Sequence, residues 1–233
     1  MRLHRFYLQA NQIDKGKINS STDLSLAHQL RSVFRLHEGS RVIFFDGSGH
    51  EYVSDIVSLN KSEVMFRVAE ERAVKRCTEL RLTLAFSLIK KDNAEWVIEK
   101  GTELGVSEFV PLVSERSEKK GFNIERATKK TIEAAEQSGR ADIADVREPV
   151  DLNNFLALET RPIVVFHTDG MTLAETNLPT SGELVACIGP EGGWSDREIE
   201  AFKAKGAIIV RLQSPVLRAE TAAVAITTLL LVK

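Results

Sequence analysis

The apolar residues follow two different patterns, and the change between them lies near residue 80. Residues 1–68 contain short runs rich in β-branched and aromatic residues that are separated by turn residues, which predicts strands. We expect these strands at residues 3–8, 41–45, 51–58 and 63–68. A helix is predicted between the first two because Leu26, Leu30, Val33 and Phe34 recur at helical spacing within residues 24–35. A small β-barrel with one helix is the expected result.

The second pattern begins at Leu80, where strand-like runs alternate with helix-like runs. This alternation is typical of a parallel α/β sheet. Strands are expected at residues 80–86, 109–113, 163–167, 184–188 and 207–211, and helices at 93–104, 124–138, 196–204 and 220–231. Residues 70–79 are charged and lack apolar periodicity, so we expect a linker there. The predicted domains are therefore residues 1–72 and 73–233.

Two loops near the end of the second domain carry the clearest functional signal. Ile188-Gly189-Pro190-Glu191-Gly192-Gly193-Trp194 follows one predicted strand, and a block with the sequence LQSPVLRAET, residues 212–221, follows another. Glycine and proline at strand ends build loops whose backbone can approach a ligand closely. Two such loops side by side would form the crevice where open α/β sheets bind small molecules. The first loop has no lysine, so it suits a neutral or zwitterionic ligand, although a tight structural turn is the alternative.

Arg218 and Glu220 lie where the last helix is expected to begin. The helix start has free N–H groups and the positive end of the helix dipole, so Glu220 could be only a cap. An arginine there is electrostatically unfavourable, which suggests an anionic partner for Arg218. Residues 222–231 are almost wholly apolar, which predicts a helix that is buried or lies in a subunit interface.

Composition narrows the class of protein. Apolar residues make up 43% of the chain and charged residues 27%, which is ordinary for a soluble globular protein. No apolar run reaches the roughly 20 residues that span a bilayer, and the first residues do not resemble a signal peptide. Cys77 and Cys187 give no disulfide framework, so we expect reduced thiols in a cytoplasmic protein.

The sequence lacks several common catalytic motifs. It contains no P-loop, no Gly-x-Gly-x-x-Gly turn, no Gly-x-Ser-x-Gly elbow and no His/Cys cluster with metal-ligand spacing. These absences argue against a nucleotide hydrolase, a standard dinucleotide dehydrogenase, an α/β-hydrolase and a zinc enzyme, and no metal is expected. Residues 1–76 hold 12 Lys and Arg against 9 Asp and Glu, whereas residues 77–233 hold 19 against 24. A basic front end fits contact with nucleic acid.

Four separated blocks resemble the RsmE family, the 16S ribosomal RNA uridine N3-methyltransferases of the SPOUT superfamily. The blocks are residues 188–194, 214–221, 96–106 and 133–140. At the front, Arg5-Phe6-Tyr7 and residues 28–35 resemble the PUA-like RNA-binding domain of the family. Phe34 and Ser40 depart from the residues that many members have, and neither touches the expected chemistry.

The resemblance implies a fold and a cofactor. The fold would be α/β, a SPOUT-type parallel sheet with a C-terminal trefoil knot, preceded by a small PUA-like β-barrel domain. Residues 214–218 would thread the loop that contains residues 189–193, and S-adenosylmethionine would bind there. The implied cofactor-binding residues are His167, Ile188, Gly189, Pro190, Glu191, Gly192, Gly193, Leu212, Leu217 and Arg218. Arg218 would stabilise negative charge on the uracil oxygens, and Glu220 would assist removal of the N3 proton.

The resemblance also implies RNA contacts and partners. We expect RNA contacts from Arg5, Arg31 and Arg35 in the first domain and from Lys90, Arg116, Gln137 and Arg140 in the second, while His28 packs against its helix. Such charges could instead form an ordinary solvated face. The expected partners are 16S rRNA in the small ribosomal subunit and a second copy of the chain, with no membrane. Two alternatives stay open: another SPOUT specificity, such as ribose 2′-O-methylation or another base, and a non-catalytic RNA-binding assembly protein.

Overall fold

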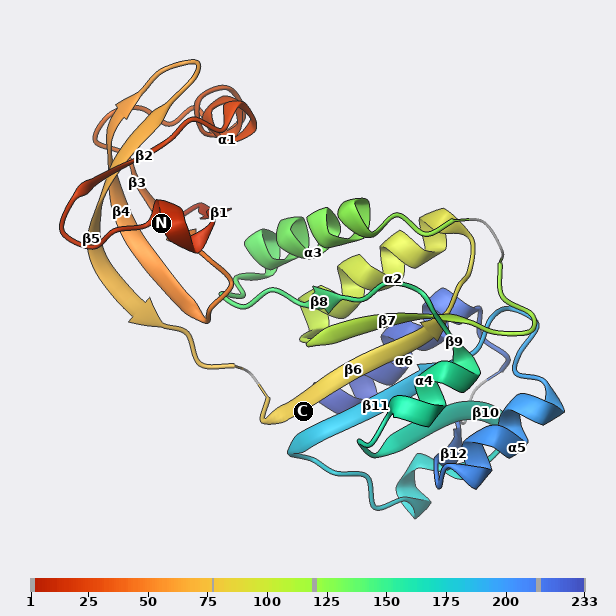
Figure 1. Cartoon of the computed structure of the whole chain (residues 1–233). Coiled ribbons are helices and arrows are strands. Elements are labelled where there is room, and N and C mark those ends of the chain that lie inside the picture. Colours follow the sequence, from red (N-terminus) through yellow and green to blue (C-terminus); the bar gives the residue numbers. More distant parts are fainter. Residues whose placement is uncertain (1–2, 77, 119–120, 213–214, 233) are drawn as a thin grey trace. The chain divides into compact units, whose positions relative to one another are not determined.

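The computed structural model describes residues 3–76, 78–118, 121–212 and 215–232 (Figure 1). Cys77 and Ser214, which figured in the sequence predictions, lie outside these ranges. The chain divides into two compact units. The first comprises Met1–Arg76 together with Ala135–Ile143, and the second comprises Cys77–Ala134 together with Ala144–Lys233. The sequence patterns did not predict that residues 135–143 belong with the first unit.

The first unit is built on a five-stranded sheet with the strand order β1-β3-β4-β5-β2. Its strands are β1 (Arg5–Tyr7), β2 (Ile18–Ser21), β3 (Arg41–Phe45), β4 (His50–Leu59) and β5 (Val64–Ala73). β1 pairs with β3 in parallel, and the other pairs are antiparallel. Gly47 and Gly49 have positive φ values in the hairpin turn between the antiparallel strands β3 and β4. The core under this sheet includes Phe6, Phe44 and Phe66.

Two expectations for this unit, the linker and the packing of His28, were wrong. The predicted linker begins inside β5, because Glu71 pairs with Tyr52 of β4 and the charged residues occupy an exposed part of the strand. The predicted helix is present, as α1 (Leu24–His28) continued by a π-helical turn at Gln29–Val33. His28 is exposed instead of packed.

The second unit contains a parallel sheet with helices on both faces (Figure 1). The strand order is β12-β10-β11-β6-β7-β8, and β9 also pairs with β7. The strands are β6 (Leu80–Ser87), β7 (Glu108–Val113), β8 (Asp145–Val146), β9 (Val150–Asp151), β10 (Ile163–Thr172), β11 (Gly182–Ile188) and β12 (Ile208–Arg211). All five strands predicted for this region are present, and the strands of this sheet pair in parallel.

The helices of this sequence region are α2 (Lys91–Leu104), α3 (Ile124–Ser138), α4 (Leu152–Leu158), α5 (Asp196–Ala204) and α6 (Ala219–Leu231). Alternate side chains of a strand point to opposite faces. Accordingly, Leu184 and Ile188 of β11 join the core beneath α2 and α6, whereas Val185 and Cys187 join the core beneath α4 and α5. Two 3-10 turns, Ala10–Gln12 and Leu173–Glu175, complete the described structure.

The strand order places the two predicted loops. The glycine-rich loop follows β11, the proline-containing loop follows β12, and β10 lies between these strands. The two loops therefore flank the carboxyl end of β10. All three strands run parallel, so the segments that follow them meet at one edge of the sheet.

Candidate active site

The loop after β11 is held in a fixed shape by its own residues. The Gly193 N–H donates to the carbonyl oxygen of Pro190 at 2.8 Å, and Gly193 has φ +68°. A Cβ on Gly189 would lie 3.2 Å from the buried indole of Trp194, so the absence of a side chain lets the ring pack there. Glu191 is exposed at the tip. The structural-turn interpretation therefore explains Gly189 and Gly193, and the exposed tip is left for a ligand.

A second set of contacts ties this loop to the segment after β7. Arg116 donates from Nη1 to the carbonyl oxygen of Gly192 at 2.7 Å. The buried carboxylate of Glu198 accepts from the N–H groups of Glu115 and Ser195, each at 2.8 Å. Ser195 is the N-cap of α5, and its side chain accepts from the N–H of Glu198. Glu198 thus fixes the backbone next to Arg116, a role that the sequence patterns did not reveal.

The loop after β12 brings two of the predicted cofactor residues to one cavity. Leu212 and Leu217 both line a cavity of about 540 Å³. Its other lining residues are Thr172, Leu173, Ala174, Arg211, Ala225 and Leu229. The lining does not include the glycine residues of the β11 loop.

The segment between these loops is an interruption in β10. Pairing of β10 with β12 breaks after Phe166 and resumes at Met171, so His167 lies on a bulge within the strand instead of at its end. The Nδ1 atom of His167 accepts a 3.3 Å hydrogen bond from the N–H of Asp169. Gly170 permits the close approach of β10 and β12, because a Cβ there would lie 2.5 Å from the backbone of Val210.

Arg218 and Glu220 begin α6 as expected, but neither caps it with a side chain. Arg218 precedes the first helical residue, is exposed, and makes no capping hydrogen bond with its side chain. The Oε2 atom of Glu220 is buried and has no hydrogen-bond partner within the part of the chain that the structure describes. Buried polar atoms are normally hydrogen-bonded, so this oxygen is available to a bound group. A cationic or N–H-bearing ligand would satisfy it.

The predicted RNA contacts divide into exposed and paired residues. Arg31, Arg35 and Gln137 are exposed. Arg35 also has φ +54°, an unusual conformation for a residue with a side chain. By contrast, Arg5 and Arg140 are largely engaged inside the first unit. Neither therefore presents the free surface charge that the sequence suggested.

The two engaged arginines form a small network. Arg5 pairs with Glu51 through Nη1 and donates from Nη2 to the carbonyl oxygen of Arg140 at 3.0 Å. Arg140 in turn pairs with Asp142 at 2.9 Å. The side chains of Arg5 and Arg140 are 9% and 12% exposed.

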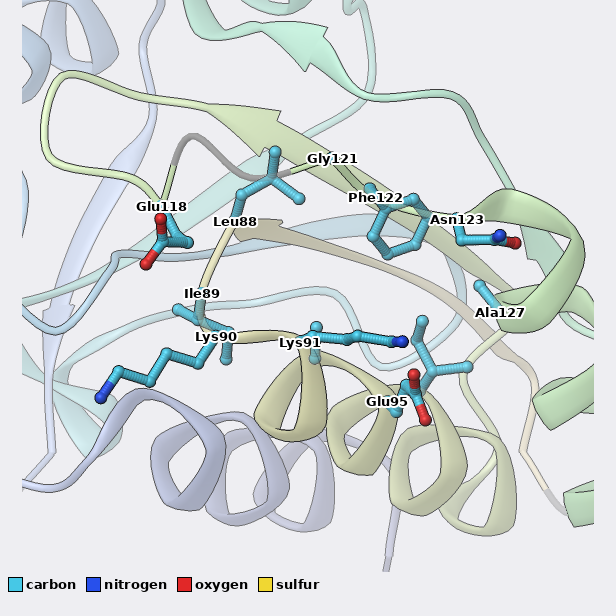
Figure 2. A pocket seen from close by; sticks show the side chains of 12 residues that line it. Leu88, Ile89, Lys90, Lys91, Glu95, Glu118, Gly121, Phe122, Asn123 and Ala127 are labelled. Carbon is cyan, nitrogen blue, oxygen red and sulfur yellow. The ribbon is translucent and has the colours of Figure 1, made fainter.

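Lys90 lies at the rim of another cavity, of about 250 Å³, at the start of α2 (Figure 2). Apolar side chains that include Leu88, Ile89 and Phe122 line it, and Lys90 extends away from the Phe122 ring in this view. Asn123 accepts from the N–H of Arg126 at 2.8 Å and so caps the start of α3. The sequence patterns did not single out Phe122 or Asn123.

The site is built from backbone loops and a few charged groups. No group of three or more His, Cys, Asp or Glu residues that could hold a metal ion occurs among the described residues. No helix in the described ranges is long and apolar enough to cross a membrane. The chemistry available is that of a carboxylate, an exposed guanidinium and fixed loop backbone.

Comparison with known proteins matches both parts of the chain. Residues 76–231 match a family model described as an RNA methyltransferase domain, and residues 27–68 match an RNA methyltransferase PUA domain. The ribosomal RNA small subunit methyltransferase E of Bacillus subtilis is 30% identical over 94% of this chain and 93% of its own length. That of Rickettsia conorii is 28% identical over 96% of this chain and 93% of its own length.

Solved structures agree with the sequence matches. A methyltransferase of Legionella pneumophila in complex with SAM has a TM-score of 0.90 and 28% identity, covering 99% of this chain and 97% of that one. The ribosomal RNA small subunit methyltransferase E of Neisseria gonorrhoeae, bound to S-adenosyl methionine, has a TM-score of 0.89 and 26% identity. This second match covers 98% of this chain and 96% of that chain.

Proposed function

Because this chain belongs to the RNA methyltransferase family, among the ribosomal RNA small subunit methyltransferases E, we propose that it methylates N3 of a uridine in 16S rRNA with S-adenosylmethionine. The observation that carries the proposal is the arrangement of the loops after β11 and β12 on either side of β10. This arrangement occurs in a chain with a TM-score of 0.90 to a methyltransferase that holds SAM.

The residues fit a cofactor recognised mainly by backbone and apolar contacts. The β11 loop presents Glu191 and Gly192 at an exposed tip, and Leu212 and Leu217 contribute apolar walls. The orphaned Oε2 of Glu220 is left for the substrate, because the N3–H of a bound uracil would satisfy it. We therefore keep the ten predicted cofactor residues as the proposed binding set. Their direct support is strongest for Leu212 and Leu217, which share a cavity.

The proposed chemistry requires few catalytic side chains. When bound, S-adenosylmethionine supplies a methyl group on a sulfonium, which is a good electrophile. The chain must hold the uridine so that N3 is aligned with that methyl group. Glu220 would accept the N3 proton, and Arg218 would stabilise negative charge on the uracil oxygens, while the methyl–sulfur bond of the cofactor would break to leave a neutral thioether. A uridine that is paired or stacked in RNA would first have to leave its stack.

The proposed assembly is a homodimer with a knotted catalytic domain. One face of α6 is buried through Ala223, Ile226 and Leu231, while Leu229 on the helix remains 55% exposed. Val216, in the segment before the helix, is 89% exposed. A second copy of the chain would cover these apolar side chains. The trefoil knot, in which the segment before α6 threads the β11 loop, is supported by the family membership.

The proposed RNA contacts are Arg31, Arg35 and Gln137 in the first unit and, independently, Lys90 and Arg116 in the second. All five are exposed. Contacts from such residues would position the RNA, while the folded shape of the small ribosomal subunit would supply specificity. Acting on ribosomal subunits, the protein would work in the cytoplasm.

The decisive experiment identifies the product nucleoside. The purified protein is incubated with isotope-labelled S-adenosylmethionine and small ribosomal subunits that lack the modification, and the digested RNA is examined by mass spectrometry. Labelled 3-methyluridine is expected. A labelled 2′-O-methyl nucleoside or another labelled methylated base would overturn the assignment to N3, but the assignment of S-adenosylmethionine as the methyl donor would stand. Absence of both label and cofactor binding would favour the non-catalytic alternative.

A further inference from the structure

The first unit contains a small cavity that neither the cofactor nor the methyl transfer uses. It has a volume of about 190 Å³. Its lining residues are Leu3, His4, Arg5, Phe34, Glu136 and Gln137, all of which belong to the first unit. This volume is below the roughly 300 Å³ at which pockets for drug-sized ligands begin. The cavity therefore suits a single planar group of the size of one base.

Two rings form an aromatic wall of this cavity. The rings of His4 and Phe34 lie 4.5 Å apart between centroids, tilted by 49°. Phe34 is held from behind by an edge-on contact with the buried ring of Phe6 at 5.2 Å. His4 is exposed, so its ring is accessible to a ligand. Bases of unpaired RNA stack on rings of this kind.

Arg5, which lines the same cavity, has a buried donor without a partner among the described residues. The guanidinium of Arg5 is fixed by Glu51, by the carbonyl oxygen of Arg140, and by the Phe45 ring, whose centroid lies 5.4 Å from Cζ. These contacts do not involve the Nε–H of Arg5, which is buried and has no hydrogen-bond partner among the residues described. An unsatisfied buried donor is costly, and an acceptor in the cavity would remove this cost. The carbonyl oxygen or ring nitrogen of a base is such an acceptor.

We propose that this cavity binds one unpaired base of the RNA substrate, stacked on His4 and Phe34 and hydrogen-bonded to the Nε of Arg5. Gln137 is exposed at the cavity and can add an amide contact. The proposal rests on the proposed function, because it assumes that the ligand is the methylated RNA. Arg5 thereby contributes to RNA recognition through a base edge instead of a phosphate.

The test separates base contacts from phosphate contacts through the salt dependence of RNA binding. The affinity for unmodified small ribosomal subunits is measured at several salt concentrations for wild type, His4→Ala, His4→Tyr and Gln137→Ala. His37→Ala is the matched control, since His37 is exposed in the same unit and its ring bonds to the neighbouring carbonyl of Glu38. His4→Ala is expected to weaken binding about tenfold with an unchanged salt slope, and His4→Tyr to restore it. Arg35→Ala, a phosphate-type variant, lowers the slope instead.

A second readout does not depend on affinity. RNA that contains 4-thiouridine is photocrosslinked to the wild-type protein, and the crosslinked peptides are sequenced. Crosslinks on peptides that carry His4 or Phe34 are expected. Crosslinks confined to the second unit, or His4→Ala and Gln137→Ala binding like His37→Ala, overturn the base site. Failure of wild type to methylate the subunits would instead overturn the proposed function, and the two failures are thereby distinguished.

Discussion

Arg116 and Gly192 are joined by a 2.7 Å hydrogen bond from Nη1 to the carbonyl oxygen, although 76 residues separate them. The bond connects the segment after β7 to the tip of the β11 loop. A Cβ on Gly192 would lie 3.3 Å from Cδ of Arg116, so the arginine stem also packs on the glycine. Arg116 therefore shapes the proposed cofactor loop, and its exposed remainder can still meet RNA.

Replacing Arg116 should therefore weaken cofactor binding even without RNA. Arg116→Ala removes one hydrogen bond, and we expect the Kd for S-adenosylmethionine to rise roughly fivefold, which corresponds to about 1 kcal/mol. Isothermal titration of the protein alone measures this effect. Arg197→Ala, an exposed arginine on α5, is the control and should bind the cofactor like wild type. An unchanged Kd for Arg116→Ala would restrict this residue to RNA contact.

Glu220→Gln tests the proposed base. The amide keeps the shape of the side chain but cannot accept the N3 proton, so the single-turnover rate should fall about 100-fold. The Kd for S-adenosylmethionine should stay within twofold of wild type. Glu103→Gln, an exposed substitution on α2, should leave the rate unchanged. Full turnover by Glu220→Gln would show that the carboxylate serves only the helix dipole.

Gly170→Ala tests the close approach of β10 and β12. The new Cβ would lie 2.5 Å from the backbone of Val210. Neither β10 nor β12 can move to relieve this clash without breaking their pairing. We expect the free energy of unfolding to fall by about 3 kcal/mol, measured by urea denaturation. Gly121→Ala is the matched control, because its Cβ would meet nothing within 4 Å. Equal stability of the two variants would contradict the packing described.

The ion network of Arg161 makes stability depend on pH. Arg161 bonds to Glu159 at 2.7 Å and to Glu108 at 3.0 Å. Burial acts to raise the pKa of both carboxyls, but hydrogen bonds, from Thr83 to Glu108 and from Arg161 to both, outweigh it and hold each pKa below its usual value. A lowered pKa in the folded state stabilises the protein above the unfolded pKa of about 4.3, and this contribution is lost as pH falls through the folded-state value.

Glu159→Gln should therefore reduce the free energy of unfolding at pH 7 by about 2 kcal/mol. The fall in stability between pH 5 and pH 3 should also become shallower, as followed by urea denaturation at each pH. Glu200→Gln, whose partner Lys203 is solvent-exposed, should change neither quantity. A parallel pH profile for Glu159→Gln and wild type would contradict the role of the network.

Local patterns predicted more of the fold than of the site. The alternation of Leu184 to Ile188 identifies a two-sided buried strand because every second residue faces the same layer. Helix α4 was missed because Leu152–Leu158 makes only two turns, too few for a visible period. The end of β5 was missed because charges on an exposed strand look like a linker until the partner strand is known.

Contacts distant in sequence explain the remaining differences. The position of β10 between β11 and β12 follows from strand order, which no single segment encodes. Arg5 was predicted from the family resemblance to contact RNA, which requires an accessible side chain. Its burial depends on Glu51, 46 residues away, and on the carbonyl of Arg140, 135 residues away. The sequence therefore predicted which residues belong to the site better than it predicted which of their side chains are exposed.

The exposed face of α6 gives the proposed dimer a sharp test. Leu229 is 55% exposed on this helix, and a charge placed in an apolar subunit interface would leave it buried and unpaired. Leu229→Glu should therefore sediment as a monomer at concentrations where wild type is a dimer. Leu158→Glu is the matched control, because Leu158 is 82% exposed and belongs to α4, which covers the face of the sheet opposite α6. The control should remain dimeric. A wild-type protein that sediments as a monomer would overturn the dimer, and dimeric Leu229→Glu would move the interface away from α6.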